Sequence, residues 1–271
     1  MARSLEGVAA VTEGRMSAGL PYLRLGQGPP LVMAVGGAAD HANPAGFMRR
    51  MALSTAAPFA AHFTVYVTSR KPGLAPGSTM ADISADFARA IEDDIGEPVA
   101  FHGTSAGGAA GLQLAIGYPR LVRRLVLVAA ACRLSPTGRR LLAEAARLVR
   151  AGDPRAASAQ VARALAPRPL RCPARALSWL ASPLAVANPA DMLITNAAAA
   201  AFNAEPELHR VLAPTLVIGG STDPYYSEDL FRRTAAGISD GRVMIFPGKG
   251  HLYACTSKAA ANIALGFFLG G

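Results

Sequence analysis

Cysteine is scarce in this sequence, and long hydrophobic runs are absent. The three cysteines, Cys132, Cys172 and Cys255, lie far apart and form no C-x-x-C pair, so neither a zinc site nor a disulfide framework is indicated. Free thiols are typical of a reducing compartment. No apolar run approaches the ~20 residues that cross a bilayer, and no hydrophobic stretch follows the N-terminal Met-Ala-Arg. We therefore expect a cytoplasmic protein that has no membrane partner.

Lysine is also rare, although the chain is basic. Only three of the 27 basic residues are lysines, and the formal net charge is +9. A net positive charge can favour nucleic acid binding. This alternative predicts a salt-dependent gel shift. However, no helix-turn-helix, RNP or zinc-finger pattern is present, and alanine and arginine are used heavily throughout. We therefore expect no nucleic acid partner. Whether the chain forms a homodimer stays open.

Short apolar segments alternate with helical patterns along most of the 271 residues. Continuous, partly β-branched runs are typical of strands that are covered on both faces. Alternation of such strands with helices predicts an α/β fold, with a doubly wound, mostly parallel eight-stranded sheet and helices on both faces. The strands are predicted at Gly7–Thr12, Tyr22–Leu25, Leu31–Val35, Phe63–Thr68, Val99–Phe101, Leu125–Val128, Thr215–Ile218 and Arg242–Phe246.

The strand pattern stops between Leu134 and Leu212, where prolines divide the chain into short helices. We expect a helical cap insertion over residues 134–212, between two parts of one core at residues 1–133 and 213–271. The single tryptophan, Trp179, lies in this insertion. Its side chain is expected either to line an apolar substrate pocket or to pack the cap against the core.

Glycines surround one serine where a predicted strand becomes a helix, in the stretch from Gly103 to Gly108. A sharp strand-to-helix turn strains its central residue, and small residues are needed where the two backbones approach closely. The turn exposes the Ser105 hydroxyl. It also places the Ala106 N–H at a helix N-terminus, where positive potential favours an oxyanion. This G-x-S-x-G pattern is typical of a nucleophile elbow. A glycine-rich turn without chemistry is the alternative.

A serine hydroxyl needs a base, usually histidine, to remove its proton. Among the five histidines, only His251 is predicted to lie in a glycine-flanked loop after the last strand. His102 falls within the strand before the elbow and is expected to be a packed core residue. His41 follows the glycine loop at Gly36 and is expected to line a pocket. These positions predict that His251 is the base.

A carboxylate must orient that base. Asp223 follows the predicted strand Thr215–Ile218, and its competitors do not follow strands. These competitors are Asp93, Asp94 and Asp191. After the strand at Leu31–Val35, the Gly37 N–H is the expected second donor to an oxyanion, and Gly36 beside it is expected to contact substrate. Tyr225, two residues after Asp223, is expected to border the same cleft.

Taken together, the loop Val35-Gly36-Gly37, the elbow, "LVIGGSTDP" and "FPGKGH" resemble the α/β-hydrolase fold superfamily, in particular its small serine hydrolases with a helical cap. The resemblance implies a triad of Ser105, His251 and Asp223, with no metal or organic cofactor. The sequence departs from the family in two places. Val35 stands where relatives commonly have histidine, and Thr68 stands where they often have aspartate.

The resemblance implies a serine hydrolase that cleaves an ester or thioester of a small, apolar substrate through an acyl-enzyme. Other chemistries use the same residues: C–C bond hydrolysis, amide or peptide cleavage, cofactor-free haloperoxidation, and acyl transfer or cyclisation. A non-catalytic small-molecule binder on the same scaffold is a further alternative.

Overall fold

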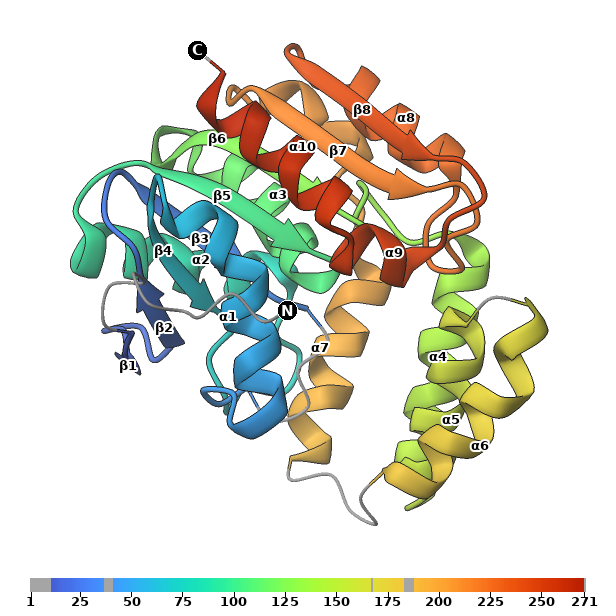
Figure 1. Ribbon diagram of the computed structural model, residues 1–271. Coiled ribbons are helices and arrows are strands. Elements are labelled where there is room, and N and C mark those ends of the chain that lie inside the picture. Colours follow the sequence, from blue (N-terminus) through green and yellow to red (C-terminus); the bar gives the residue numbers. More distant parts are fainter. Residues whose placement is uncertain (1–10, 37–40, 167, 183–187, 271) are drawn as a thin grey trace, which may run out of the picture.

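The computed structural model describes residues 11–36, 41–166, 168–182 and 188–270. Within these residues, eight strands form one sheet in the order β1-β2-β4-β3-β5-β6-β7-β8 (Figure 1). β1 pairs antiparallel with β2, and β2 with β4, whereas every other pair is parallel. The strands are β1 (Thr12–Arg15), β2 (Pro21–Leu25), β3 (Pro30–Ala34), β4 (Thr64–Thr68), β5 (Val99–Thr104), β6 (Val122–Val128), β7 (Thr215–Gly220) and β8 (Gly241–Phe246).

Helices cover both faces of the sheet, as the alternating sequence pattern predicts. On one face lie α1 (Gly46–Ala60), α9 (His251–Thr256) and α10 (Lys258–Leu269), which Figure 1 shows in front of the strands. The other face carries α2 (Met80–Ala90), α3 (Ala106–Gly117) and α8 (Glu228–Ala236). The central strands bury side chains on both faces, and all residues of β3 and β7 are buried. This explains their continuous apolar sequence.

The predicted strands from Tyr22 onward are confirmed, and their ends differ from the predicted ones by at most a few residues. The first prediction, Gly7–Thr12, lies mostly outside the described residues. The strand that pairs with β2 is instead Thr12–Arg15. Its position depends on a turn at Gly19, whose φ of 86° favours glycine. Helix α1 has no counterpart among the predicted elements.

The boundaries of helix α2 have local causes. The Thr79 hydroxyl accepts a hydrogen bond from the Asp82 N–H, and the Asp82 carboxylate accepts one from the Thr79 N–H. This capping box satisfies two N–H groups that otherwise lack partners at a helix start. At the other end a π-helical turn (Ile91–Ile95) leads to Gly96, which is left-handed with a φ of 78°.

Helices α4 (Pro136–Arg150), α5 (Pro154–Leu165), α6 (Arg171–Ala181) and α7 (Pro189–Ala201) lie between β6 and β7 in the chain. They confirm the helical insertion and form the cap. The arrowheads of β5 and β7 point toward this part of the molecule (Figure 1). Three of the four helices start with proline. Proline suits the first turn because it lacks an N–H, and an N–H at this position would have no partner within the helix. Across the described residues, no helix combines the length and the apolar character needed to cross a membrane.

Helix α7 of the cap is joined to the core by a buried ion pair. The Asp191 carboxylate accepts hydrogen bonds from the Gly73 N–H (2.9 Å) and the Leu74 N–H (2.8 Å). Arg70, which follows β4, donates to the same carboxylate at 3.2 Å, and both side chains are almost fully buried. The pair therefore connects a cap helix with the loop after a central strand.

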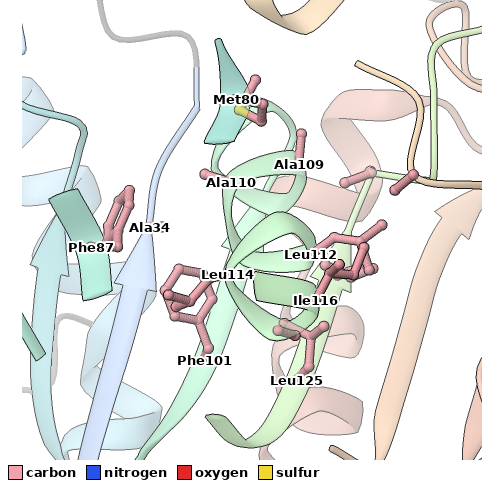
Figure 2. Close-up of a cluster of buried hydrophobic side chains, with 14 of the residues drawn as sticks. Ala34, Met80, Phe87, Phe101, Ala109, Ala110, Leu112, Leu114, Ile116 and Leu125 are labelled. Carbon is pink, nitrogen blue, oxygen red and sulfur yellow. The ribbon is translucent and has the colours of Figure 1, made fainter. Parts of the chain in front are cut away.

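A glycine in α3 allows that helix to lie close to β5. A Cβ on Gly111 would come 2.4 Å from the Phe101 ring, which is fully buried. Figure 2 shows Phe101 beside Leu114 of α3, with Leu112 and Ile116 also packed inward. The absence of a side chain at this position therefore sets the distance between helix and sheet.

Two glycines of α3 allow a matched test of this packing. We expect Gly111→Ala to lower the free energy of unfolding by about 1–3 kcal/mol, because the added methyl overpacks the core. Gly117→Ala is the control, since a Cβ there meets nothing within 4 Å. It should leave stability unchanged or raise it by about 0.5–1 kcal/mol, from helix propensity alone. Urea denaturation measures both, and an equal effect of the two changes would contradict the packing account.

Candidate active site

Ser105 occupies a strained backbone position between β5 and α3. Its φ is 54° and its ψ is −120°, an unusual conformation for a residue other than glycine. Its N–H donates to the Val128 carbonyl (2.9 Å), and its own carbonyl accepts from the Gly108 and Ala109 N–H groups. Such strain persists only where the surroundings hold the residue in place. These bonds to β6 and α3 supply that restraint.

The glycines around Ser105 are required by close backbone contacts. A Cβ on Gly103 would lie 2.6 Å from the Gly108 Cα, and one on Gly107 would lie 2.3 Å from the Ala34 carbonyl oxygen. A Cβ on Gly108 would lie 2.4 Å from the Ala130 side chain. Real Cβ atoms do not approach this closely. The turn therefore has the geometry that the G-x-S-x-G pattern predicts.

The glycine loop after β3 touches the start of α3. A Cβ on Gly36 would lie 2.7 Å from the Ala106 nitrogen and 3.1 Å from the Ser105 Cβ. Ala106 is the first residue of α3, so its N–H belongs to the group that has no partner within the helix. Gly37, predicted as the second oxyanion donor, lies outside the described residues. What the structure does show is that the loop just before it reaches the elbow.

His251 is bonded to Asp223, which comes from the preceding strand connection. Its Nδ1 lies 2.7 Å from the Asp223 Oδ2, and the two side chains are 8% and 0% exposed. The other oxygen of Asp223 accepts from the N–H groups of Tyr225 (2.8 Å) and Tyr226 (3.1 Å). An ionised carboxylate only accepts hydrogen bonds, so Nδ1 is the donor and Nε2 is left for another partner.

The prediction that His251 lies in a loop is wrong, because it is the first residue of α9. Gly250 precedes the helix in an extended conformation. The two loops that carry His251 and Asp223 are also held to each other. The Thr222 N–H donates to the Lys249 carbonyl (3.0 Å), and the Gly248 N–H donates to the Ser221 hydroxyl (2.8 Å). The histidine is therefore fixed by a helix and by hydrogen bonds between the two loops.

The surroundings of His251 change its proton affinity. Burial opposes the charged imidazolium, but hydrogen bonds and charge interactions with Asp223 and Cys255 outweigh it, so the pKa of His251 lies well above its ordinary value of 6.5. The rings of Tyr225 and Tyr226 enclose the imidazole, the first edge-on at 5.3 Å and the second stacked at 6.3 Å between centroids. Burial raises the pKa of Tyr225 to about 12, so its hydroxyl is neutral.

The carboxylates that compete with Asp223 in the sequence have other partners. Asp93 and Asp94 accept hydrogen bonds from Ser17, and Asp191 pairs with Arg70. His102 is buried within β5 with its ring edge-on to Phe59, as expected of a core residue, and burial lowers its pKa to about 4.

The residues predicted to bind substrate lie in different surroundings. Gly36 and His41 border a narrow cavity beside the start of α3, and Tyr225 lies against His251. Trp179 is 46% exposed on α6, and its ring lies 5.3 Å from the Arg155 guanidinium. It is not among the residues that line this cavity.

One feature of the site has no counterpart in the predictions, namely the buried pair of Arg70 and Asp191. Arg70 also borders the cavity beside the elbow. Its position directly after a predicted strand was the available signal, because the ends of parallel strands meet at the edge of the sheet where sites form.

Comparisons with known proteins support the fold. The chain is similar to a hydrolase from Pseudomonas aeruginosa PA01 (TM-score 0.75, 23% identity), over 96% of this chain and 98% of that one. It is also similar to a thermophilic esterase from Thermogutta terrifontis (TM-score 0.73, 18% identity), over 96% of this chain and 98% of that one. A third similar structure is the enol-lactonase from Burkholderia xenovorans LB400 (TM-score 0.72, 19% identity), over 95% of this chain and 99% of that one. At these identities the likeness shows the fold. The model of the alpha/beta hydrolase family matches residues 21–260, and the chain belongs to this family.

Proposed function

We propose that this protein is a serine hydrolase that cleaves an ester or thioester of a small, apolar substrate through an acyl-enzyme. The observation that carries the proposal is the buried bond of 2.7 Å between His251 Nδ1 and Asp223 Oδ2. This bond orients the imidazole of His251, which follows β8. Ser105, with a φ of 54°, follows the parallel strand β5 at the same edge of the sheet. Nucleophile, base and orienting acid are the three parts that acyl transfer to serine requires.

In the proposed reaction, the Ser105 hydroxyl attacks the carbonyl carbon of the substrate while His251 Nε2 takes its proton. Asp223 holds the imidazole by Nδ1 and stabilises the imidazolium charge. The N–H groups of Ala106 and Gly37 donate to the oxyanion. His251 then gives the proton to the leaving alcohol or thiol, and the acyl group stays on Ser105. Water activated by His251 releases the acid and restores the hydroxyl.

The choice of an ester bond has support from two relatives, which are named as an esterase and an enol-lactonase. Both names refer to cleavage of an ester linkage. The cavity beside the elbow is lined mainly by apolar side chains, which suits an apolar acyl group.

Substitution of the three residues tests the assignment. With p-nitrophenyl butyrate as substrate, we expect Ser105→Ala and His251→Gln each to lower kcat by at least about 10⁴-fold. Asp223→Asn should lower kcat by about 10⁴-fold, because the amide is uncharged and can donate to Nδ1, which favours the wrong imidazole tautomer. A fluorophosphonate probe should label the wild-type protein and leave Ser105→Ala unlabelled.

The matched controls are Ser84→Ala, a buried serine of α2, and His209→Gln, an exposed histidine of the 3-10 helix Glu205–Arg210. Both should keep full turnover and labelling. A folded wild-type protein that is neither labelled nor active on acetate, butyrate or the corresponding thioesters would contradict the proposal and favour a non-catalytic binder.

The pH dependence follows from the raised pKa of His251. A general base must be neutral, so kcat/KM should rise with pH along one limb whose midpoint lies above 6.5. Asp223→Asn removes the charge and the bond that favour the imidazolium, so its residual activity should show a midpoint at lower pH. Initial rates between pH 5 and 10, corrected for hydroxide hydrolysis, measure both. A wild-type midpoint at or below 6.5 would count against this account.

A further inference from the structure

A buried arginine beside the elbow has a donor without a partner. Arg70 is 5% exposed, and its Nη1 donates to the Lys71 carbonyl (2.7 Å) and to Asp191 Oδ2 (3.2 Å). Its Nη2 donates to the Asp191 carbonyl (3.0 Å). Its Nε is buried and has no hydrogen-bond partner in the described chain. A buried donor left in this state is unfavourable, so it indicates a missing acceptor.

The same arginine borders a cavity of about 20 Å³, which is room for one or two groups of the size of a water molecule. Figure 2 shows Met80 of α2 next to Ala109 and Ala110 in the first turns of α3. Most of the lining is apolar, and Ala106 places the cavity one residue from Ser105. The lining residues are Val35, Gly36, His41, Arg70, Met80, Ile83, Phe87, Ala106, Gly107, Ala110 and Thr195.

The charge of Arg70 is already balanced. Asp191 is its ion partner, and two backbone N–H groups complete the bonds of that carboxylate. A second carboxylate in the cavity would be buried with no cation of its own, which is costly. A neutral oxygen needs no such compensation and satisfies the free Nε–H. The site therefore favours an ether, hydroxyl or keto oxygen over an anion.

We propose that this cavity takes the end of a short acyl chain and that the Arg70 Nε–H donates to a neutral oxygen in that chain. The inference rests on the proposed function, since an acyl group on Ser105 lies beside Ala106. It narrows the substrate class to esters or thioesters of short acids that carry an ether, hydroxyl or keto group. A trapped water that satisfies Nε is the competing occupant, and it predicts no such preference.

Pairs of esters that differ by one oxygen test the proposal. p-Nitrophenyl methoxyacetate is compared with the butyrate, and the 3-methoxypropionate with the pentanoate, so that an oxygen replaces a methylene at two distances from the carbonyl. Each kcat/KM is divided by the rate constant for hydroxide hydrolysis of the same ester. We expect the wild-type protein to favour the ether in at least one pair by about tenfold, which corresponds to about 1.4 kcal/mol.

Two variants assign the preference to Arg70. Arg70→Lys keeps the cation and removes Nε, and the double variant Arg70→Met, Asp191→Asn removes the donor without leaving an unpaired charge. In both variants, the normalised kcat/KM of the ether ester should come within about twofold of that of the matching alkyl ester, whatever the absolute rates. Arg133→Lys is the control, because Arg133 pairs with Glu205 and does not line the cavity. It should keep the wild-type ratio.

Binding without turnover separates this inference from the proposed function. The Ser105→Ala protein is titrated with N-methyl methoxyacetamide and N-methylbutyramide by ligand-observed NMR, and about tenfold tighter binding of the ether is expected. If the wild-type protein is neither labelled nor active on esters, only the hydrolase proposal is refuted. The relative binding of the two amides would still show whether the cavity prefers a chain with an ether oxygen. Equal binding of the two amides, equal normalised rates in both ester pairs, or a preference that survives in both Arg70 variants would overturn the role of Arg70.

Discussion

The strained conformation of Ser105 depends on backbone contacts from three different strands. The Ser105 N–H donates to the Val128 carbonyl at the end of β6. The end of β3 packs against Gly107, and Gly103 of β5 packs against Gly108 of α3. The contacts with β6 and β3 exist only once the sheet has formed. The elbow is therefore a product of the assembled parallel sheet, which supplies the free energy that holds one residue at a positive φ.

The same sheet order explains how Asp223 and His251, which lie on separate loops, come together. β7 and β8 are neighbours and run parallel, so the loops that follow them leave the sheet at one edge. Hydrogen bonds between these loops then fix Asp223 and His251, which lie 28 residues apart in the chain, at hydrogen-bond distance. Burial of both side chains strengthens this bond, since water neither competes for it nor screens it.

The ion pair of Arg70 and Asp191 has two consequences. It attaches a helix of the cap to the loop after β4, across 121 residues of sequence. It also compensates the positive charge of Arg70, which lines the cavity beside the elbow. The cap thus affects the polarity of the cavity in two ways. The Asp191 carboxylate neutralises Arg70, and Thr195 lines the cavity directly.

Local sequence determined much of this protein. Continuous apolar runs mark the strands, and the capping box of Thr79 and Asp82 marks the start of α2, because both signals come from side chains within a few residues. Helix α1 carries no such signal, since its exposed face includes Phe47 and Met48 while only Ala56 and Phe59 are buried. Its packing against α10 and β4 decides its place.

The glycines around Ser105 were also evident in the sequence, because they meet a local backbone requirement. Only the tertiary structure decided which carboxylate meets which cation. Asp191 binds Arg70 and Asp223 binds His251 because folding brings each pair together in an interior that excludes water. Attraction between charges depends on distance and burial, and neither quantity is encoded by spacing along the chain.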